Sequence, residues 1–459
     1  MQKHFKHMKA LKLCLLLVIM TIFIILTAYG VTSMVLGGKS FAGRSLMVKI
    51  PILLFSTCLT LGLLILFHYS LNSESQWNDK VKVIFRAVAK FISDKKMIFI
   101  WIFIILIIFV NIRLTFWSDH FQPGDLDSFL SSGKAASSGE NPYTALTSEG
   151  YPLFNRNPPV SLLAFIPLKN YTVNQVLPYM RAFSALLLVF SVVLLYLTHW
   201  PKSPFVHVAA LMAASGFWII YSVGQIYMFL VFFIVLAWFF MERKRYILAG
   251  IFIGVVVAVK PSFIILPGLL FLAGYFKLSI SAFISTVITT LLPAPILGFE
   301  VFREWIKLNS TAFLEEGMIL PDNMSAFAFG CRIGIPWLGF VIVGIIGLAT
   351  IIWLLIKKPS LKTIFKAGLV VSVLASPFGW TMYVAFFLPI YFVQKWDKLL
   401  VIASIIFMIP GATLRYLSSF SQTALVAVGI ISFTACLLLL ISIASSAPTK
   451  NKLVGGTEY

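Results

Sequence analysis

The sequence has few acidic residues and few charges of either sign. Of its 459 residues, 16 are Asp or Glu and 36 are Lys or Arg, so charged residues make up only 11% of the chain. Soluble globular proteins carry about 25% charged residues, whereas 60% of this chain is hydrophobic. The composition therefore excludes a water-soluble enzyme and indicates a polytopic membrane protein.

Cysteine is also scarce, and the cysteines that are present do not form a framework. Cys14, Cys58, Cys331 and Cys436 lie far apart, and three of them sit in apolar runs. No pair of histidines has the spacing of metal ligands either. The sequence thus offers no case for a disulfide scaffold, a required metal or another cofactor.

The net charge of +20 would suggest nucleic-acid binding in a soluble protein. In this chain, however, Lys and Arg gather in short turns between apolar runs. This is the positive-inside pattern, in which basic turns stay in the cytoplasm and set the orientation of the spans. We therefore expect a lipid bilayer and no nucleic acid among the partners.

Apolar runs predict about fourteen membrane spans. A span needs about 20 apolar residues, and shorter runs can cross beside partner helices. We therefore expect an all-α fold, a polytopic transmembrane helical bundle with extracytoplasmic loop helices. The expected spans are 14–36, 48–69, 97–117, 176–199, 205–221, 226–241, 246–259, 263–276, 279–299, 336–356, 367–376, 383–393, 399–410 and 423–446.

The distribution of charge predicts three regions along the chain. Residues 1–96 are expected to form a transmembrane hairpin followed by a basic amphipathic segment on the cytoplasmic leaflet. Residues 97–446 are expected to form the catalytic membrane domain, and residues 447–459 a cytoplasmic tail.

The basic turns also predict an orientation. The turns at 242–245, 357–366 and 395–398 are expected in the cytoplasm. The long loops 117–159 and 300–336, which hold most of the acidic residues, are then expected outside. We predict a multi-pass protein of the cell membrane, with both termini cytoplasmic and the active site extracytoplasmic.

One polar stretch, GDLDSFLSSGKAASSGENPYTALTSEGYPLFNRNPP at 124–159, stands between the apolar runs. Asp125 and Asp127 follow a Pro–Gly pair, so either carboxylate can cap the helix that begins there. A carboxylate held near an acceptor hydroxyl can also act as a general base. Both roles stay open for the pair, one residue capping and the other catalysing.

These residues resemble the first extracytoplasmic loop of glycosyltransferase family 87, the membrane mannosyl- and arabinofuranosyl-transferases of the GT-C superfamily. The likeness rests on Asp125, on Phe129 four residues later and on the motif GENPY. It continues in FNRNPPVSLLAFIPL, GQIYMFLVF, AGIFIGVVVAVKPSFIILP, DNMSAFAFGCRIG and SPFGWTMYVAFFLP, in the family's order between 117 and 390. The chain departs from the family in its extra N-terminal hairpin and in Met382, where a histidine is expected.

The resemblance implies a catalytic role for Asp125 as the base that takes a proton from the acceptor. Lys260 and Arg332 would stabilise the leaving phosphate, and Tyr143 would take the place of the tyrosine in the family's NPY motif. The further substrate-binding candidates are Asp127, Asn141, Arg156, Gln225, Asn323, Trp380 and Tyr383.

Several of these candidates also have a plain structural explanation. Lys260 lies at the outer end of an expected span, where a lysine can extend its ammonium to the membrane surface. Arg113 can do the same or can contact a lipid phosphate. Trp380 and Tyr383 can serve as interfacial aromatic residues.

The resemblance implies an inverting glycosyltransferase. It would move a hexose or pentose, with mannose expected, from a polyprenyl-phosphate donor to a hydroxyl of a glycolipid or glycan acceptor. A lipid-linked saccharide flippase or transporter is the alternative, and a structural subunit of a polysaccharide assembly complex is a third possibility. An active Asp125→Asn variant would contradict the enzyme hypothesis.

Overall fold

The computed structural model describes residues 96–116, 124–198, 204–310 and 316–446. The chain divides into two units, 1–99 and 100–459, and the second contains every described helix except the first turn of α4 (Lys96–Phe116). The expected spans at 14–36 and 48–69, the basic segment after them and the tail 447–459 lie outside the described residues.

Every described element is a helix, in agreement with the expected fold class. Among the described residues, four helical segments are long and apolar enough to cross a membrane, and α8 (Pro204–Met212) with α9 (Ser215–Val223) makes a fifth candidate, bent by 62°. The four segments are α7 (Val173–Thr198), α13 (Phe276–Leu291) with α14 (Ala294–Leu297), α18 (Pro336–Lys357) and α23 (Gln422–Ser445).

The expected count of about fourteen spans is therefore not confirmed. Many expected spans are shorter helices, and a helix of 14 residues is only about 21 Å long, less than the roughly 30 Å of bilayer hydrocarbon. These helices are α10 (Tyr227–Glu242), α11 (Tyr246–Val259), η4 with α12 (Pro261–Ile264 and Ile265–Leu272), α19 (Leu361–Leu374), η6 with α20 (Thr381–Phe387 and Leu388–Val393) and α21 (Lys398–Phe407).

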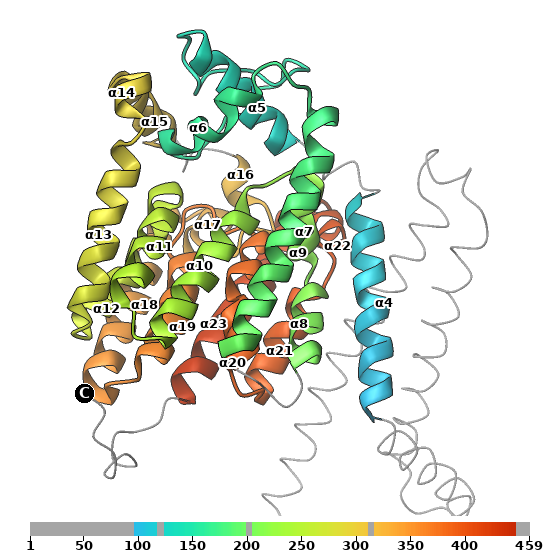
Figure 1. Cartoon of the computed structure of the whole chain (residues 1–459). Coiled ribbons are helices and arrows are strands. Elements are labelled where there is room, and N and C mark those ends of the chain that lie inside the picture. The colour runs from blue at the N-terminus through green and yellow to red at the C-terminus, as the bar shows by residue number, and fades with distance from the viewer. Residues whose placement is uncertain (1–95, 117–123, 199–203, 311–315, 447–459) are drawn as a thin grey trace, which may run out of the picture. The chain divides into compact units, whose positions relative to one another are not determined.

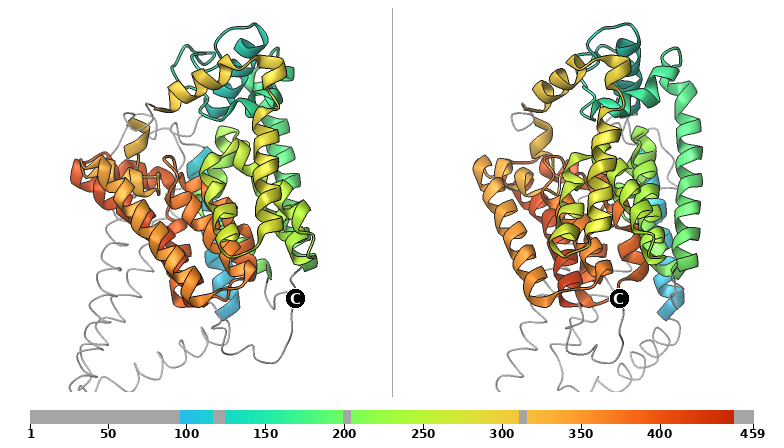
Figure 2. Two further views of the ribbon diagram at one scale, coloured as in Figure 1. Left: turned by 90° about the vertical axis from the view of Figure 1, so that its left-hand side faces the viewer. Right: turned by 60° about the vertical axis from the view of Figure 1, so that its left-hand side comes forward.

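A layer of short helices covers one end of the bundle (Figure 1). This outer layer consists of α5 (Gly124–Ser137), η2 (Pro159–Ser161), α6 (Leu162–Phe165), η3 (Ile166–Leu168) and α15 (Glu300–Ser310). Between the outer layer and the long helices lie α16 (Glu316–Ile319), α17 (Ala326–Arg332) and α22 (Gly411–Ser418) (Figure 2).

The outer layer has a small hydrophobic core of its own, separate from the large core of the bundle. Leu126, Phe129 and Leu130 of α5 pack there with Phe165 of α6, and the rings of Phe129 and Phe165 are 5.0 Å apart. Ile226, at the start of α10, packs against both cores. The outer layer and the bundle therefore meet at the turn between α9 and α10.

Helix α7 links the two cores covalently. Val176 and Leu177 near its start belong to the core of the outer layer, and Leu195 near its end belongs to the core of the bundle. In Figure 1 it runs beside the bundle from one end to the other. The beginning of α5 is thus held over the ends of the bundle helices.

Candidate active site

Asp125 lies in the first turn of α5, where its carboxylate faces the bundle. Gln225 donates a hydrogen bond from Nε2 to Asp125 Oδ2 over 2.6 Å. The two residues come from opposite sides of the interface, since α5 belongs to the outer layer and Gln225 to the turn between α9 and α10. The sequence predicted both as site residues, and the structure brings them together.

The turn that carries Gln225 is fixed by its backbone. Gly224 ends α9 in the left-handed conformation, with φ +71°, and the amides of Gly224 and Gln225 both donate to the carbonyl of Ile220. Arg181 of α7 donates to the carbonyl of Tyr221, also at the end of α9. A left-handed glycine is the usual way to end a helix, and here it aims the next side chain at Asp125.

Lys260 approaches the same carboxylate from α11. It caps the C-terminal end of α11, and Pro261 prevents the helix from continuing. Its ammonium lies 4.8 Å from the ring centre of Tyr227 and 5.8 Å from that of Tyr383, within the range of a cation–π interaction. The hydroxyls of these two tyrosines are 3.4 Å apart.

A second cation is supplied by α22. Arg415 Nη2 donates to Oδ2 of Asp322 over 2.8 Å, and Asp322 is almost fully buried, at 1% exposure. The backbone carbonyl of Asp322 in turn accepts from the amide of Thr381, at the start of η6. Asp322 therefore joins both Arg415 and the start of η6 to the loop before α17.

These groups act in opposite directions on the acidity of Asp125. Burial raises the pKa of its carboxyl above the usual 3.8, and this is the largest effect. The hydrogen bond from Gln225 and the positive charges of Lys260 and Arg415 lower the pKa and offset part of that increase. The result is a carboxylate that is more basic than an ordinary aspartate and has cations nearby.

Other predicted residues hold the outer layer together. Asp127 accepts hydrogen bonds from the amide and the hydroxyl of Ser148, so its carboxylate fastens the following loop. Asn141 donates to Glu304 of α15 over 2.8 Å. The buried Tyr143 hydroxyl donates to the carbonyl of Asn157, and burial raises its pKa.

Arg156 connects the outer layer with the loop before η6. Its guanidinium donates to the carbonyl of Leu308 and lies 5.3 Å from the ring centre of Phe378. Trp305 of α15 donates to the Arg156 carbonyl. Burial lowers the pKa of Arg156. Phe378 stacks on Trp380, which is partly exposed, so Arg156 and Trp380 both contact the ring of Phe378.

Asn323 joins two segments that are distant in the sequence. Its amide donates to the carbonyl of Pro377 and accepts from the amides of Ser325 and Gly379, and its side chain is fully buried. Trp380 pairs with Asn323 in an isolated β-bridge. Asn323 therefore shapes the site from beneath, and its amide groups are occupied by the backbone.

Arg332 lies in a place that differs from the expected phosphate contact. Its guanidinium is 1% exposed and donates to the carbonyls of Ile319, Leu320 and Asn323. Burial lowers its pKa to about 10. Nε and Nη2 of Arg332 thus hold the loop before α17, while its buried Nη1 has no hydrogen-bond partner among the described residues.

Sequence reasoning missed Tyr227, Asp322 and Arg415. The signal for Arg415 was available, since it stands in the short polar segment GATLRYLSSFSQ, in a turn expected on the outer side, where basic residues are uncommon. Met382, in place of the expected histidine, is 7% exposed and packs in the bundle core. Among the described residues, no group of three His, Cys, Asp or Glu side chains could hold a metal ion.

The arrangement combines a base with cations, and it lies between two layers of a helical membrane protein. Residues 155–377 match the model of glycosyltransferase family 87, a segment that includes Gln225, Lys260 and Asp322. Neither a curated protein nor a solved structure is similar enough to the chain to count as a match. The chain is thus similar to glycosyltransferase family 87 over residues 155–377.

Proposed function

We propose that the protein transfers a sugar, with mannose expected, from a polyprenyl phosphate to a hydroxyl of a glycolipid or glycan, with inversion, on the extracytoplasmic face. The observation that supports this most is the meeting of Asp125, Gln225, Lys260 and Arg415 at one interface. A single displacement needs a base for the acceptor and positive charge for the leaving group, and these residues supply both.

In this reaction, Asp125 takes the proton of the acceptor hydroxyl while the acceptor oxygen attacks the anomeric carbon of the sugar. The bond from that carbon to the phosphate oxygen breaks, and its electron pair stays on the departing polyprenyl phosphate. Lys260 and Arg415 stabilise the charge that develops there. We give Arg415 the role that the sequence suggested for Arg332, because Nε and Nη2 of Arg332 already donate to backbone carbonyls.

Gln225 and Tyr383 are proposed to orient the base and the donor. Gln225 Nε2 already donates to Asp125, and its Oε1 is buried without a hydrogen-bond partner among the described residues. That oxygen can accept from a sugar or acceptor hydroxyl. The Tyr227 and Tyr383 rings keep the Lys260 ammonium close to the site.

The proposal is tested with the Asp125→Asn variant of the purified protein, given radiolabelled polyprenyl-phosphate mannose and a membrane lipid extract as acceptor. A general base contributes about 100- to 10,000-fold to a rate, so transfer should fall by at least about 100-fold. Asp127→Asn is the matched control, because Asp127 fastens the loop at Ser148 and should keep most of the activity.

Two results would overturn the proposal. Full transfer by Asp125→Asn would show that Asp125 is not the base and would favour the transporter hypothesis. An active wild-type protein that uses only nucleotide sugars would contradict the polyprenyl-phosphate donor. Polyprenyl-phosphate arabinose, tested beside the mannose donor, decides between hexose and pentose.

A further inference from the structure

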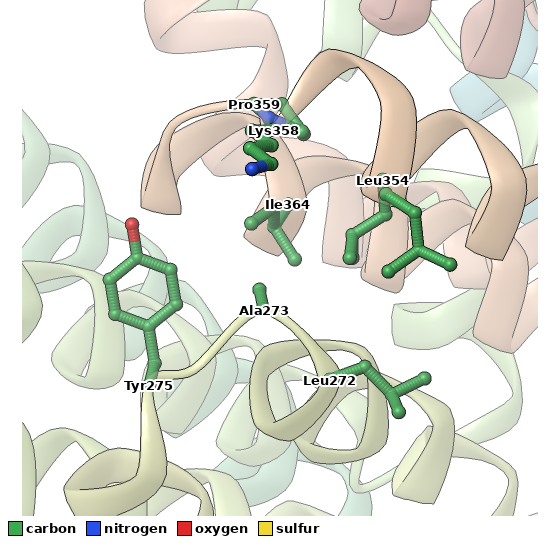
Figure 3. A pocket seen from close by; sticks show the side chains of 8 residues that line it. Leu272, Ala273, Tyr275, Leu354, Lys358, Pro359 and Ile364 are labelled. Atoms are coloured by element: carbon green, nitrogen blue, oxygen red, sulfur yellow. The ribbon is translucent and has the colours of Figure 1, made fainter.

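A polar pocket lies at the end of the bundle opposite the candidate active site. It has a volume of about 320 Å³ and is formed by the turn between α12 and α13 and the turn between α18 and α19. Figure 3 shows the Lys358 ammonium and the Tyr275 hydroxyl at this pocket, over Ala273 and Ile364. It therefore offers one cation and one hydroxyl at a membrane boundary.

An apolar groove adjoins the polar pocket. The groove has a volume of about 440 Å³, and Leu272 lines both spaces. It runs along α12 between α13 and α18, and its lining is almost entirely hydrocarbon. Gly268 and Gly347 open it further, since a Cβ added at either glycine would meet nothing within 4 Å.

Lys358 is held in an unusual backbone conformation. It caps α18 with φ +45° and ψ +58°, in the left-handed region, and a proline follows it. A lysine rarely adopts this conformation, and a residue before proline normally has an extended backbone. The conformation places the ammonium at the pocket, whereas Lys357, one residue earlier, does not line it.

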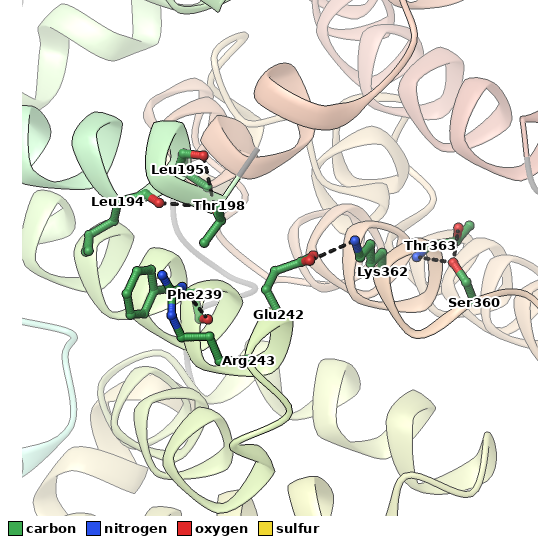
Figure 4. Close-up of polar contacts among 9 residues, drawn as sticks. All are labelled: Leu194, Leu195, Thr198, Phe239, Glu242, Arg243, Ser360, Lys362 and Thr363. Carbon is green, nitrogen blue, oxygen red and sulfur yellow. Dashed lines mark hydrogen bonds and ion pairs between the residues drawn. The ribbon is translucent and has the colours of Figure 1, made fainter. Parts of the chain in front are cut away.

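The surrounding turns are strongly basic. The described turns and helix ends on this side carry Arg243, Lys244, Arg245, Lys277, Lys357, Lys358, Lys362, Lys395 and Lys398. Glu242 is paired with Lys362 over 2.7 Å (Figure 4), and Asp397 caps α21. Ion pairs among the described residues involve Arg303, Lys362 and Arg415, so Lys358 keeps its charge for another partner.

We propose that the pocket and the groove together bind one anionic phospholipid of the leaflet opposite the candidate active site. The phosphate of the headgroup accepts from Lys358 and Tyr275, and one acyl chain lies in the groove against Gly268 and Gly347. Charge complementarity selects an anionic headgroup, because basic turns at a membrane surface attract anionic lipids. The shared residue Leu272 marks the point where headgroup and chain meet.

The test is native mass spectrometry of the full-length protein after exchange into micelles with phosphatidylglycerol or phosphatidylcholine. The wild type should keep one phosphatidylglycerol in preference to phosphatidylcholine. Lys358→Asn keeps a residue that tolerates the left-handed conformation and should weaken retention about fivefold, the effect of one lysine at an anionic surface. Lys357→Gln is the control with the same loss of charge.

The groove is tested by Gly347→Leu, which fills open space. This variant should also lose the bound phosphatidylglycerol. Gly344→Leu is the matched control, because Gly344 lies one turn away on α18, also faces open space and does not line the groove. Circular dichroism of all four variants confirms that each one is folded.

Three outcomes would overturn the proposal. Equal retention of phosphatidylglycerol by Lys358→Asn and Lys357→Gln would show that Lys358 does not contact the headgroup. Displacement of the lipid by glycerol phosphate alone would show an anion pocket without a chain site. Displacement by polyprenyl phosphate would assign the groove to the glycosyl donor. These measurements need no catalysis, so they do not depend on the proposed function.

Discussion

At the scale of single residues, the surroundings of the Asp125 carboxylate suit the role in proton transfer that we propose for it. Burial makes it a stronger base, while Gln225, Lys260 and Arg415 stabilise its charged form. A base works best when its pKa lies near the working pH. The neighbours therefore set the pH range in which the proposed reaction can run.

This balance predicts the pH dependence of transfer. The base must be deprotonated, and its pKa is above 3.8, so activity should fall at low pH sooner than for an ordinary aspartate. Lys260→Gln removes a charge that lowers this pKa. The acidic limb of the pH–rate profile should then move to higher pH.

The profile of Lys134→Gln serves as the control, since Lys134 is an exposed residue in the last turn of α5. Its acidic limb should coincide with that of the wild type. An unchanged limb in Lys260→Gln, whatever its rate, would mean that Lys260 does not act on the base.

Arg332 and Arg415, which both lie on the outer side of the bundle, should respond differently to substitution. Arg332→Met leaves three carbonyls without their donor and should lower the free energy of unfolding by about 3–5 kcal/mol. Arg332→Lys should rescue little of this, because lysine lacks the planar fork. Thermal unfolding in detergent measures both variants.

The Arg415→Met variant is compared with Arg332→Met. Its side chain is 24% exposed, so it should lose transfer activity more than stability. A stable Arg332→Met protein without transfer activity would instead support the contact between Arg332 and the leaving phosphate that the sequence suggested.

At the scale of elements, the turn between α9 and α10 joins the site to both hydrophobic cores. Gly224 adopts a left-handed backbone there, and a Cβ at this position would lie 2.7 Å from the Leu126 Cβ of α5. Gly224 thus adopts the backbone conformation that the turn requires and also leaves room for the close approach of α5 to the bundle. Few other residues can do both.

Gly224→Ala should therefore reduce transfer by pushing α5 away from Gln225. The strain of the left-handed alanine alone costs about 1 kcal/mol. Gly274→Ala has the same strain, with φ +89°, but faces open space in the turn between α12 and α13. If initial rates show that both variants lose activity equally, the contact with Leu126 has no role in the site.

Elements also show where sequence reasoning succeeded and where it did not. Periodic apolar runs predicted the helices well, since α7, α18 and α23 lie within a few residues of the expected spans. Their number as spans is not confirmed, because Pro261 and the turn before α9 divide apolar runs of the described residues into pieces too short to cross alone. A hydrophobic run indicates that a segment is shielded from water. It does not tell whether lipid or other parts of the protein surround that segment.

The same limit applies to the site. Asp125 and Gln225 were predicted because a family motif contains them, and they lie in contact. Arg332 was expected at a phosphate because the family resemblance suggests that it faces the site. Its carbonyl partners could not be read from the sequence, since they come from residues up to thirteen positions away in an irregular loop. Tyr227 has no sequence signal within an apolar run, since only the packing of η6 brings Tyr383 to it.

At the scale of the whole molecule, the basic turns and the candidate site lie at opposite ends of the bundle. Exposed cysteines should therefore be labelled from opposite sides of the membrane. In a variant without Cys14, Cys58, Cys331 and Cys436, a Glu149→Cys protein should react with an impermeant maleimide in intact cells. Lys395→Cys should react only after permeabilisation. The reverse pattern would invert the proposed orientation.

The division of the site between two layers has a further consequence. The base belongs to the outer layer, whereas the amide and the cations that stabilise it belong to the bundle. If α5 moves away from the bundle to admit a lipid-linked donor, Asp125 moves away from both Gln225 and Lys260 at the same time. In that case the substrates would bind while Asp125 lacks the neighbours that stabilise its charge. Transfer of the sugar would begin only when the outer layer returns to the bundle, and this order would limit hydrolysis of the donor.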